Sequence, residues 1–220
     1  MKFSAIIFDL DGTIINSEHI WQKATNQLIT LKGGFLPLDQ HNNLQTALCG
    51  LAMHKACALI KDALQLQESV ESLMETKKSL AVALYHEGIQ FIEGFESFHQ
   101  KTNLLKLKTG IATNADDTTL SMVKSSLNLS RFFGNHIYSI SNVNNICKPD
   151  PAIYLHAARQ LSVDPKECMA IEDSAHGIRA AQAAGMFCIG IATSKDPYQT
   201  KEADIIIHSY DQIDLHTLLQ

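Results

Sequence analysis

The segment Phe3-Ser4-Ala5-Ile6-Ile7-Phe8-Asp9-Leu10-Asp11-Gly12-Thr13 joins a short apolar run to two carboxylates and a glycine. The run Phe3–Phe8 favours a buried strand, because isoleucine and phenylalanine are enriched in strands. Asp9 and Asp11 follow directly, and they repel each other unless a cation or a proton relieves them. Oxygen ligands of this kind suit Mg²⁺, and Gly12 permits a tight turn that presents backbone N–H groups to an anion.

The same segment has a structural alternative, because Asp-Gly is a common turn dipeptide. The pattern Asp9-x-Asp11-Gly12-Thr13 needs four specified residues, which at average composition arise by chance in a chain of this length only about 10⁻³ times. A functional site at this strand end is therefore favoured.

Five further apolar runs predict strands, with helical patterns between most of them. The strands are expected at Lys108–Ala112, Ile137–Ile140, Cys168–Ile171, Phe187–Ala192 and Asp204–Ile207, and the helices near Asp116–Leu127, Asp150–Leu161, Ala175–Ala184 and Asp211–Leu219. This alternation predicts an α/β fold with a doubly wound parallel sheet covered on both faces. Ligands of such sheets bind at the carboxyl ends of the strands.

The stretch from Ile15 to His86 interrupts the alternation, since it shows helical periodicity and no convincing strand. Two sets of apolar residues recur at helical spacing: Trp21, Ala24, Leu28 and Leu31, and Ala56, Leu59, Ile60 and Ala63. We interpret both sets as core faces of helices. The sequence thus predicts an all-helical domain over residues 15–87, inserted into a core made of residues 1–14 and 88–220.

Polar residues also follow three other predicted strands. Thr113 and Asn114 can donate to phosphate oxygens, although a Thr-Asn pair also caps helices. Lys148 precedes a proline-rich helix start, and it can place a positive charge in the site or lie solvated at the surface. Glu172 and Asp173 repeat the carboxylate pattern of the first strand. Capping of the next helix is the alternative for Asp173, but a metal ligand is favoured because Asp9 and Asp11 already need a cation.

The order of the four motifs resembles the haloacid dehalogenase-like superfamily, in its branch of sugar phosphatases and phosphoglucomutase-like proteins. The motifs are Asp9-x-Asp11-Gly12-Thr13, Thr113-Asn114, Lys148-Pro149-x-Pro151 and Glu172-Asp173-Ser174. The first and last are specific, whereas the middle two gain weight from order and spacing. The resemblance covers essentially the whole chain and implies a Rossmann-like catalytic core with an inserted helical cap.

The resemblance also implies roles for single residues. Asp9 would attack phosphorus and form an aspartyl-phosphate, with Asp11 as general acid and base. The Mg²⁺ ligands would be the Asp9 carboxylate, the Asp11 backbone carbonyl and the Asp173 carboxylate, and Glu172 would order the water ligands. The phosphate oxygens would be held by Thr113, Asn114 and Lys148.

The choice between phosphatase and phosphomutase depends on the cap. In the resembling mutases a cap loop presents an arginine after a glycine, but the comparable stretch here, Cys49-Gly50-Leu51-Ala52-Met53-His54-Lys55, contains none. The sequence therefore favours a Mg²⁺-dependent phosphatase of a small phosphate monoester, with a sugar phosphate as the expected class, and a phosphomutase as the alternative. The leaving group is expected to contact, and to be distinguished by, the cap residues Gly50, Met53 and His54.

Two further alternatives stay open. A catalytically idle phosphate-binding protein would usually have lost Asp9, Asp11 or Asp173, and all three are present. A phosphotransferase with an acceptor other than water has the same motifs as a hydrolase. No G-x-G-x-x-G or G-x-x-x-x-G-K-[ST] motif is found, which disfavours a dinucleotide-dependent dehydrogenase and a nucleotide-cradling loop.

The composition of the chain limits the classes of partner that we expect it to bind. With 18 basic and 23 acidic residues the formal charge is −5, which disfavours nucleic-acid binding. No apolar run approaches the ~18 residues of a membrane span. The five cysteines form no C-x-x-C, so neither a disulfide framework nor a zinc site is expected. We expect a cytoplasmic protein, a monomer by default, that binds a small phosphorylated substrate.

Overall fold

The computed structural model describes the chain except residues 1, 34–43, 45–46, 49–52 and 195. The chain forms two compact units, Met1–Ser17 with Ile89–Gln220, and Glu18–Gly88. The sequence placed the first boundary after residue 14. Ile15 pairs with Phe91 in an antiparallel bridge, and the Asn16 N–H donates to the Gln90 carbonyl at 3.0 Å. Residues 15–17 therefore belong to the first unit.

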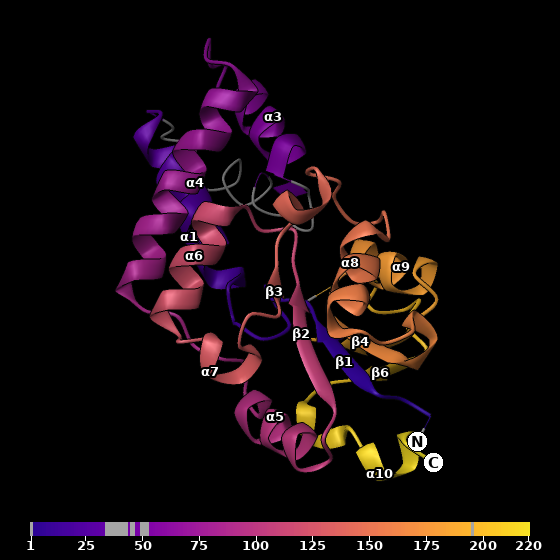
Figure 1. Cartoon of the computed structure of the whole chain (residues 1–220). Helices are drawn as coiled ribbons and strands as arrows, with labels where there is room; N and C mark the ends of the chain where they lie inside the picture. The colour runs from indigo at the N-terminus through magenta and orange to yellow at the C-terminus, as the bar shows by residue number, and fades with distance from the viewer. Residues whose placement is uncertain (1, 34–43, 45–46, 49–52, 195) are drawn as a thin grey trace. The chain divides into compact units, whose positions relative to one another are not determined.

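The first unit contains a six-stranded parallel sheet with the strand order β3-β2-β1-β4-β5-β6 (Figure 1). Its strands are β1 (Ala5–Phe8), β2 (Lys108–Ala112), β3 (Ile137–Tyr138), β4 (Cys168–Glu172), β5 (Phe187–Ile191) and β6 (Ile205–Ile207). Each expected strand is present, with its ends shifted by at most two residues. The order runs outwards from β1 in both directions, which confirms the predicted doubly wound sheet.

Helices and 3₁₀ turns lie between these strands and after the last of them. They are α5 (Phe95–Leu104), α6 (Asp117–Ser126), α7 (Ser130–Phe133), η1 (Ile140–Val143), α8 (Ala152–Leu161), η2 (Pro165–Glu167), α9 (Ala175–Ala183), η3 (Tyr210–Gln212) and α10 (Leu215–Leu218). The expectation of one helix near Asp211–Leu219 is wrong. The Asp214 side chain accepts hydrogen bonds from the His216 and Thr217 N–H groups and so starts a new helix after η3.

Both faces of the sheet are covered by helices. On one face Ala5 and Ile7 of β1 pack with apolar residues of α8 and α9, which lie side by side in Figure 1. On the other face the Phe8 ring meets Phe95 of α5 at 5.9 Å and Phe133 of α7 at 5.7 Å. Alternate residues of one strand thus enter two separate cores, as the buried strands predict.

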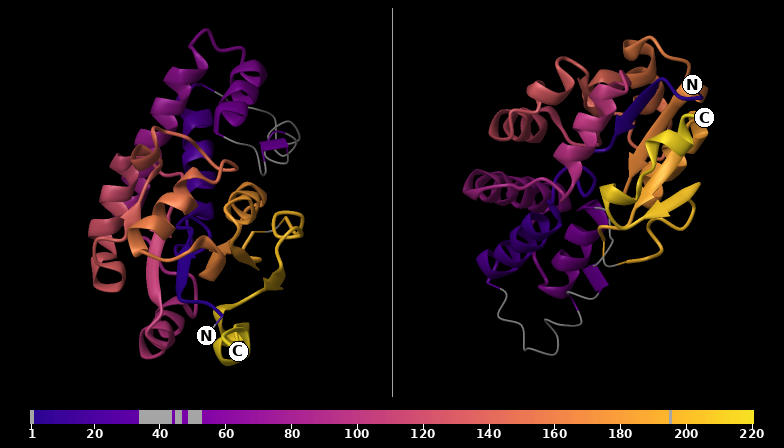
Figure 2. Two further views of the ribbon diagram at one scale, coloured as in Figure 1. Left: turned by 45° about the vertical axis from the view of Figure 1, so that its right-hand side comes forward. Right: turned by 90° about the horizontal axis from the view of Figure 1, so that it is seen from below.

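The ends of the chain lie side by side, at the amino end of β1 (Figure 2). The Lys2 N–H donates to the Leu219 carbonyl at 3.2 Å. The strand ends that carry Asp9 and Glu172 lie at the opposite, carboxyl edge of the sheet, because all its strands are parallel.

The second unit is helical in its described residues, with α1 (Glu18–Leu31), α3 (Met53–Ala63) and α4 (Val70–Glu87). Its apolar cluster includes Leu28 and Ile60, as the helical periodicity predicts. The prediction is wrong for Leu31, which is 63% exposed, and for Ala63, which is also exposed. Each of these two is the last residue of its helix. Over the described ranges, none of the helices has the length and apolar character that a bilayer span requires.

One buried histidine makes the stability of the core depend on pH. His99 on α5 is 1% exposed, its Nε2 lies 3.1 Å from the Thr109 hydroxyl, and the Phe132 and Phe133 rings lie 5.1 and 5.0 Å away. Burial lowers the pKa of His99 to about 4. The unfolded chain, with a histidine pKa near 6.5, therefore binds more protons than the folded chain between these two values.

We expect this histidine to destabilise the fold as the pH falls from about 6.5 to about 4, with a slope of at most about 1.4 kcal/mol per pH unit. Urea unfolding at a series of pH values measures the slope. His99→Phe keeps a ring but cannot titrate, so its slope should be smaller than that of the natural chain. Replacement of the exposed His208 by Gln is the matched control, and an equal change in both variants would contradict the assignment.

Candidate active site

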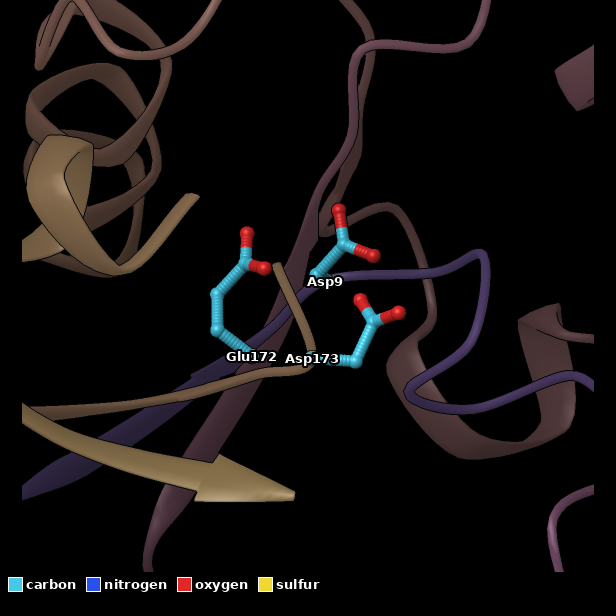
Figure 3. A group of neighbouring side chains, drawn as sticks. All are labelled: Asp9, Glu172 and Asp173. Atoms are coloured by element: carbon cyan, nitrogen blue, oxygen red, sulfur yellow. The ribbon is translucent and has the colours of Figure 1, made fainter. Parts of the chain in front are cut away.

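Three carboxylates converge at the carboxyl ends of β1 and β4. Asp9 follows β1, Glu172 is the last residue of β4, and Asp173 comes next. The two strands are hydrogen-bonded neighbours in register, with Phe8 opposite Ile171, which brings these strand ends together. One oxygen from each carboxylate lies within 4.8 Å of the others, and Figure 3 shows the Asp9 and Asp173 carboxyl groups facing each other.

The Lys148 ammonium lies between two of these carboxylates. Its Nζ is 2.5 Å from Asp9 Oδ1 and 2.6 Å from Glu172 Oε1. A third bond, at 2.8 Å, goes to the carbonyl oxygen of Ala112 at the end of β2. The side chain is only 3% exposed, so the solvated alternative is excluded. Burial would lower the pKa of Lys148, but the charges of Asp9 and Glu172 outweigh burial and raise it, so the lysine stays charged.

The charges of this cluster do not balance. Three carboxylates lie close to one ammonium, so the cluster carries an excess of two negative charges whenever all three carboxylates are ionised. Burial raises the pKa of Asp9 to about 8 although Lys148 opposes the shift. The pKa of Asp173 is also raised, first by burial and then by the charge of Asp9. A buried set of carboxylate oxygens with this excess charge fits a hard divalent cation such as Mg²⁺.

The Glu172 carboxylate is held on both oxygens. Oε1 accepts from Lys148 and, at 2.9 Å, from the Tyr154 hydroxyl, and Oε2 accepts from the Ser174 hydroxyl at 3.0 Å. Tyr154 lies on α8, and its ring centroid is 4.9 Å from Lys148 Nζ. The sequence analysis missed Tyr154, because a buried tyrosine on the apolar face of a helix is ordinary core.

Two helix-capping alternatives are settled. The N-cap of α6 is Asp116, so Thr113 and Asn114 do not cap it. The N-cap of α9 is Ser174, which leaves the Asp173 carboxylate to face Asp9.

Thr113 and Asn114 are placed differently from each other. Thr113 is buried, and its hydroxyl accepts from the Ala115 N–H at 3.0 Å. Asn114 is exposed, and its Oδ1 accepts from the Lys148 N–H at 3.0 Å. Asn114 therefore holds the backbone of the lysine, a contact that the sequence did not predict.

The turn after Asp9 approaches Asp173 closely. Gly12 has φ +82°, and a Cβ on it would lie 2.1 Å from Asp173 Oδ2, so only glycine fits. The Thr13 hydroxyl lies 3.4 Å from Asp173 Oδ1. Asp11 lies in this turn and forms a bridge with Ile15. Its carboxylate is not a member of the cluster found among the described residues.

The expected cap residues lie in the second unit. Gly50 falls outside the described residues. Met53 begins α3 and packs on the apolar cluster of that unit, whereas His54 is exposed, with its Nε2 4.0 Å from Glu71 Oε1. The structure thus joins Asp9, Glu172, Lys148 and Asn114 by hydrogen bonds and places an Asp173 carboxylate oxygen within 4.8 Å of those of Asp9 and Glu172. Met53 and His54 lie in a separate unit.

The chain belongs to the haloacid dehalogenase-like hydrolases, whose family model matches residues 3–185. Among its relatives is the validoxylamine A 7'-phosphate phosphatase of Streptomyces hygroscopicus subsp. limoneus, 26% identical over 96% of each chain. Another is the phosphorylated carbohydrates phosphatase of Thermotoga maritima, 26% identical over 83% of this chain and 82% of the relative. A conserved haloacid dehalogenase-like protein of Agrobacterium tumefaciens, solved by crystallography, superposes with a TM-score of 0.79 at 26% identity, over 99% of this chain and 97% of its own.

The close approach of α9 to Glu172 gives a test of the site's packing. A Cβ on Gly177 would lie 1.7 Å from Glu172 Oε1. Alanine in place of glycine favours a helix by about 1 kcal/mol, but here Gly177→Ala must displace a carboxylate that holds three hydrogen-bond partners. We expect the free energy of unfolding to fall by about 1–3 kcal/mol, as measured by urea denaturation.

A double-mutant cycle controls for other effects of the alanine. In the Glu172→Ala background the carboxylate is gone, so Gly177→Ala should cost much less there. An equal cost in both backgrounds would place the conflict elsewhere.

Proposed function

We propose that this hydrolase is a Mg²⁺-dependent phosphatase that acts on a small phosphate monoester, with a sugar phosphate as the substrate class. The observation that carries the proposal is the largely buried cluster of three carboxylates, Asp9, Glu172 and Asp173, in which one ammonium, that of Lys148, contacts Asp9 and Glu172. The family supports the reaction class. The two relatives named as phosphatases of phosphorylated carbohydrates and of validoxylamine A 7'-phosphate support the substrate class.

Asp9 is the proposed nucleophile. A carboxylate oxygen of Asp9 bonds to phosphorus while the bond from phosphorus to the ester oxygen breaks, and Asp11 gives a proton to the departing alcohol. Water then attacks the aspartyl-phosphate, Asp11 takes a proton from that water, and release of phosphate restores Asp9. The Asp9 and Asp173 carboxylates and the Asp11 carbonyl would hold Mg²⁺, with Glu172 ordering its waters. The cation lessens the repulsion between carboxylate and phosphate.

Lys148 serves the nucleophile as well as the substrate in this proposal. Its charge opposes the rise in the pKa of Asp9 and so favours the ionised form that attack requires. Its position beside Asp9 also suits a phosphate oxygen, and Thr113 and Asn114 are the proposed uncharged partners of the phosphate.

The second unit is the proposed cap. It contributes none of the four core motifs, so the feature that distinguishes one ester from another is expected there, around Gly50, Met53 and His54. A phosphomutase, a transferase with another acceptor and an idle phosphate-binding protein are the outcomes against which this proposal is tested.

Phosphate release is the first test. Purified protein is incubated with a panel of sugar phosphates and other small phosphate esters, with Mg²⁺ and again with EDTA. We expect release that requires Mg²⁺ and is fastest with a few sugar phosphates. Asp9→Asn should abolish release and keep the fold, because it removes the nucleophile at nearly constant volume. Asp211→Asn, at an exposed carboxylate of the same unit, is the control.

Failure of this test takes distinct forms. Isomerised sugar phosphate without free phosphate would indicate a mutase. Phosphate binding without turnover would indicate the idle protein. Full release by Asp9→Asn would refute the covalent mechanism.

Substitution of the expected cap residues should change the selectivity of the enzyme among phosphate esters. Met53→Ala and His54→Ala should alter the relative kcat/KM values over the ester panel by about tenfold for at least one pair of esters. The rate with a minimal phosphate ester should change little, since the core motifs are intact. Lys78→Ala, in α4 of the same unit, is the comparison variant. Unchanged relative rates in both cap variants would show that selectivity lies elsewhere.

A further inference from the structure

Two hydroxyl groups from the C-terminal part of the core bind the turn that follows Asp9. The Thr193 hydroxyl lies 2.6 Å from the Gly12 carbonyl oxygen, and the Tyr210 hydroxyl lies 2.9 Å from the Thr13 carbonyl oxygen. Both residues lie beyond residues 3–185, the stretch that the family model matches. The four core motifs therefore do not include them.

Thr193 reaches across one strand. It follows β5, whereas Gly12 follows β1, and β4 lies between these two strands in the sheet. The hydrogen bond therefore spans the end of β4, the strand that Asp173 follows. Gly12 lies so close to the Asp173 carboxylate that a Cβ on it would overlap that group, so a bond that fixes the Gly12 carbonyl also limits how far the turn can move from Asp173.

Described residues near Thr193 in the sequence are anchored to the core. The Gln199 side chain accepts from the Ala175 N–H, at the start of α9, at 3.2 Å. Thr200 is 3% exposed and packs on β5, where a Cβ on Gly190 would lie only 3.0 Å from Thr200 Cβ. Thr193 itself is held at the end of β5, where its N–H donates to the Ile191 carbonyl at 3.0 Å and the Ala192 N–H donates to the Ile207 carbonyl of β6 at 2.8 Å.

Tyr210 is fixed by packing. It is 1% exposed, and its ring lies 5.9 Å from Phe95 and 5.2 Å from Phe98, both on α5. Thr13, whose carbonyl it binds, has no exposed surface. Loss of the hydroxyl would leave that carbonyl without the partner described for it, which is costly in a buried position.

We propose that Thr193 and Tyr210 are positioning residues for phosphoryl transfer. They hold the backbone of the Asp11–Thr13 turn, so that Asp11 and the Asp9–Asp173 pair keep their relative positions. The described hydrogen bonds of both hydroxyls end on backbone carbonyls, so both act through the turn and not on the substrate. This inference rests on the proposed function.

The test uses variants that keep the shape of the side chain and remove only its hydrogen-bond donor. Thr193→Val and Tyr210→Phe each delete one hydroxyl, and Thr193→Ser restores it. Thr102→Val is the matched control: its buried hydroxyl donates to the His99 carbonyl at 2.7 Å on α5, outside the carboxylate cluster. For each variant kcat and KM are measured at saturating Mg²⁺, the Mg²⁺ dissociation constant is measured by calorimetry without substrate, and Tm is measured by thermal unfolding.

We expect all three hydroxyl deletions to lower Tm by about 2–4 °C. Only Thr193→Val and Tyr210→Phe should lower kcat, by about tenfold, with KM within about twofold. The same two should weaken Mg²⁺ binding by a similar factor. Thr193→Ser should match the natural chain.

A kcat and a Mg²⁺ dissociation constant equal to those of Thr102→Val in both variants would overturn the inference while leaving the proposed function intact. If Tyr210→Phe does not fold, the comparison of Thr193→Val with Thr193→Ser decides. If the natural chain releases no phosphate from any ester, the proposed function fails, and the Mg²⁺ titration alone then decides whether the two hydroxyls position the turn.

Discussion

The contact of the Lys148 ammonium with Asp9 and Glu172 is the interaction on which the site depends. Carboxylates buried this close together would protonate or move apart without a positive charge among them. The lysine supplies one positive charge to the three carboxylates, and the negative charge that they carry beyond it when ionised suits a divalent cation. The same contact joins three segments of the fold, because Asp9 follows β1, Glu172 ends β4, and the lysine also binds the carbonyl at the end of β2.

Further contacts around Lys148 and Glu172 restrict the movement of these side chains. Tyr154 and Ser174 hold the far side of Glu172, Asn114 holds the lysine backbone, and glycine at positions 12 and 177 lets backbone come close to carboxylates. Each of the hydrogen bonds among these contacts contributes about 0.5–3 kcal/mol by itself. Together they give the charged groups few alternative arrangements, which is how a site keeps its geometry through a reaction.

The sequence predicted the sheet, and it predicted that Asp9, Glu172 and Asp173 would meet, because parallel strand ends share one edge. It did not predict Tyr154, Thr193 or Tyr210 as neighbours of the site, since each is a common residue whose role arises from contacts made far along the chain. Helix α5 was missed because its buried side chains include the polar His99 and Thr102, which hide the apolar period. Leu31 shows a further limit. Periodicity identifies the buried face of a helix, but it does not identify the residue beyond which neighbouring elements no longer cover that face.

The bond from Tyr210 to Thr13 spans 197 positions of sequence. During synthesis the Asp9 strand therefore emerges first, but the hydrogen bond that supports the turn after it can form only once residue 210 has been made. Chains that have not yet reached residue 210 lack this support. A chain of this design therefore cannot complete its site when the core motifs of its first strand appear, because the last support of the turn lies 197 positions further along the chain.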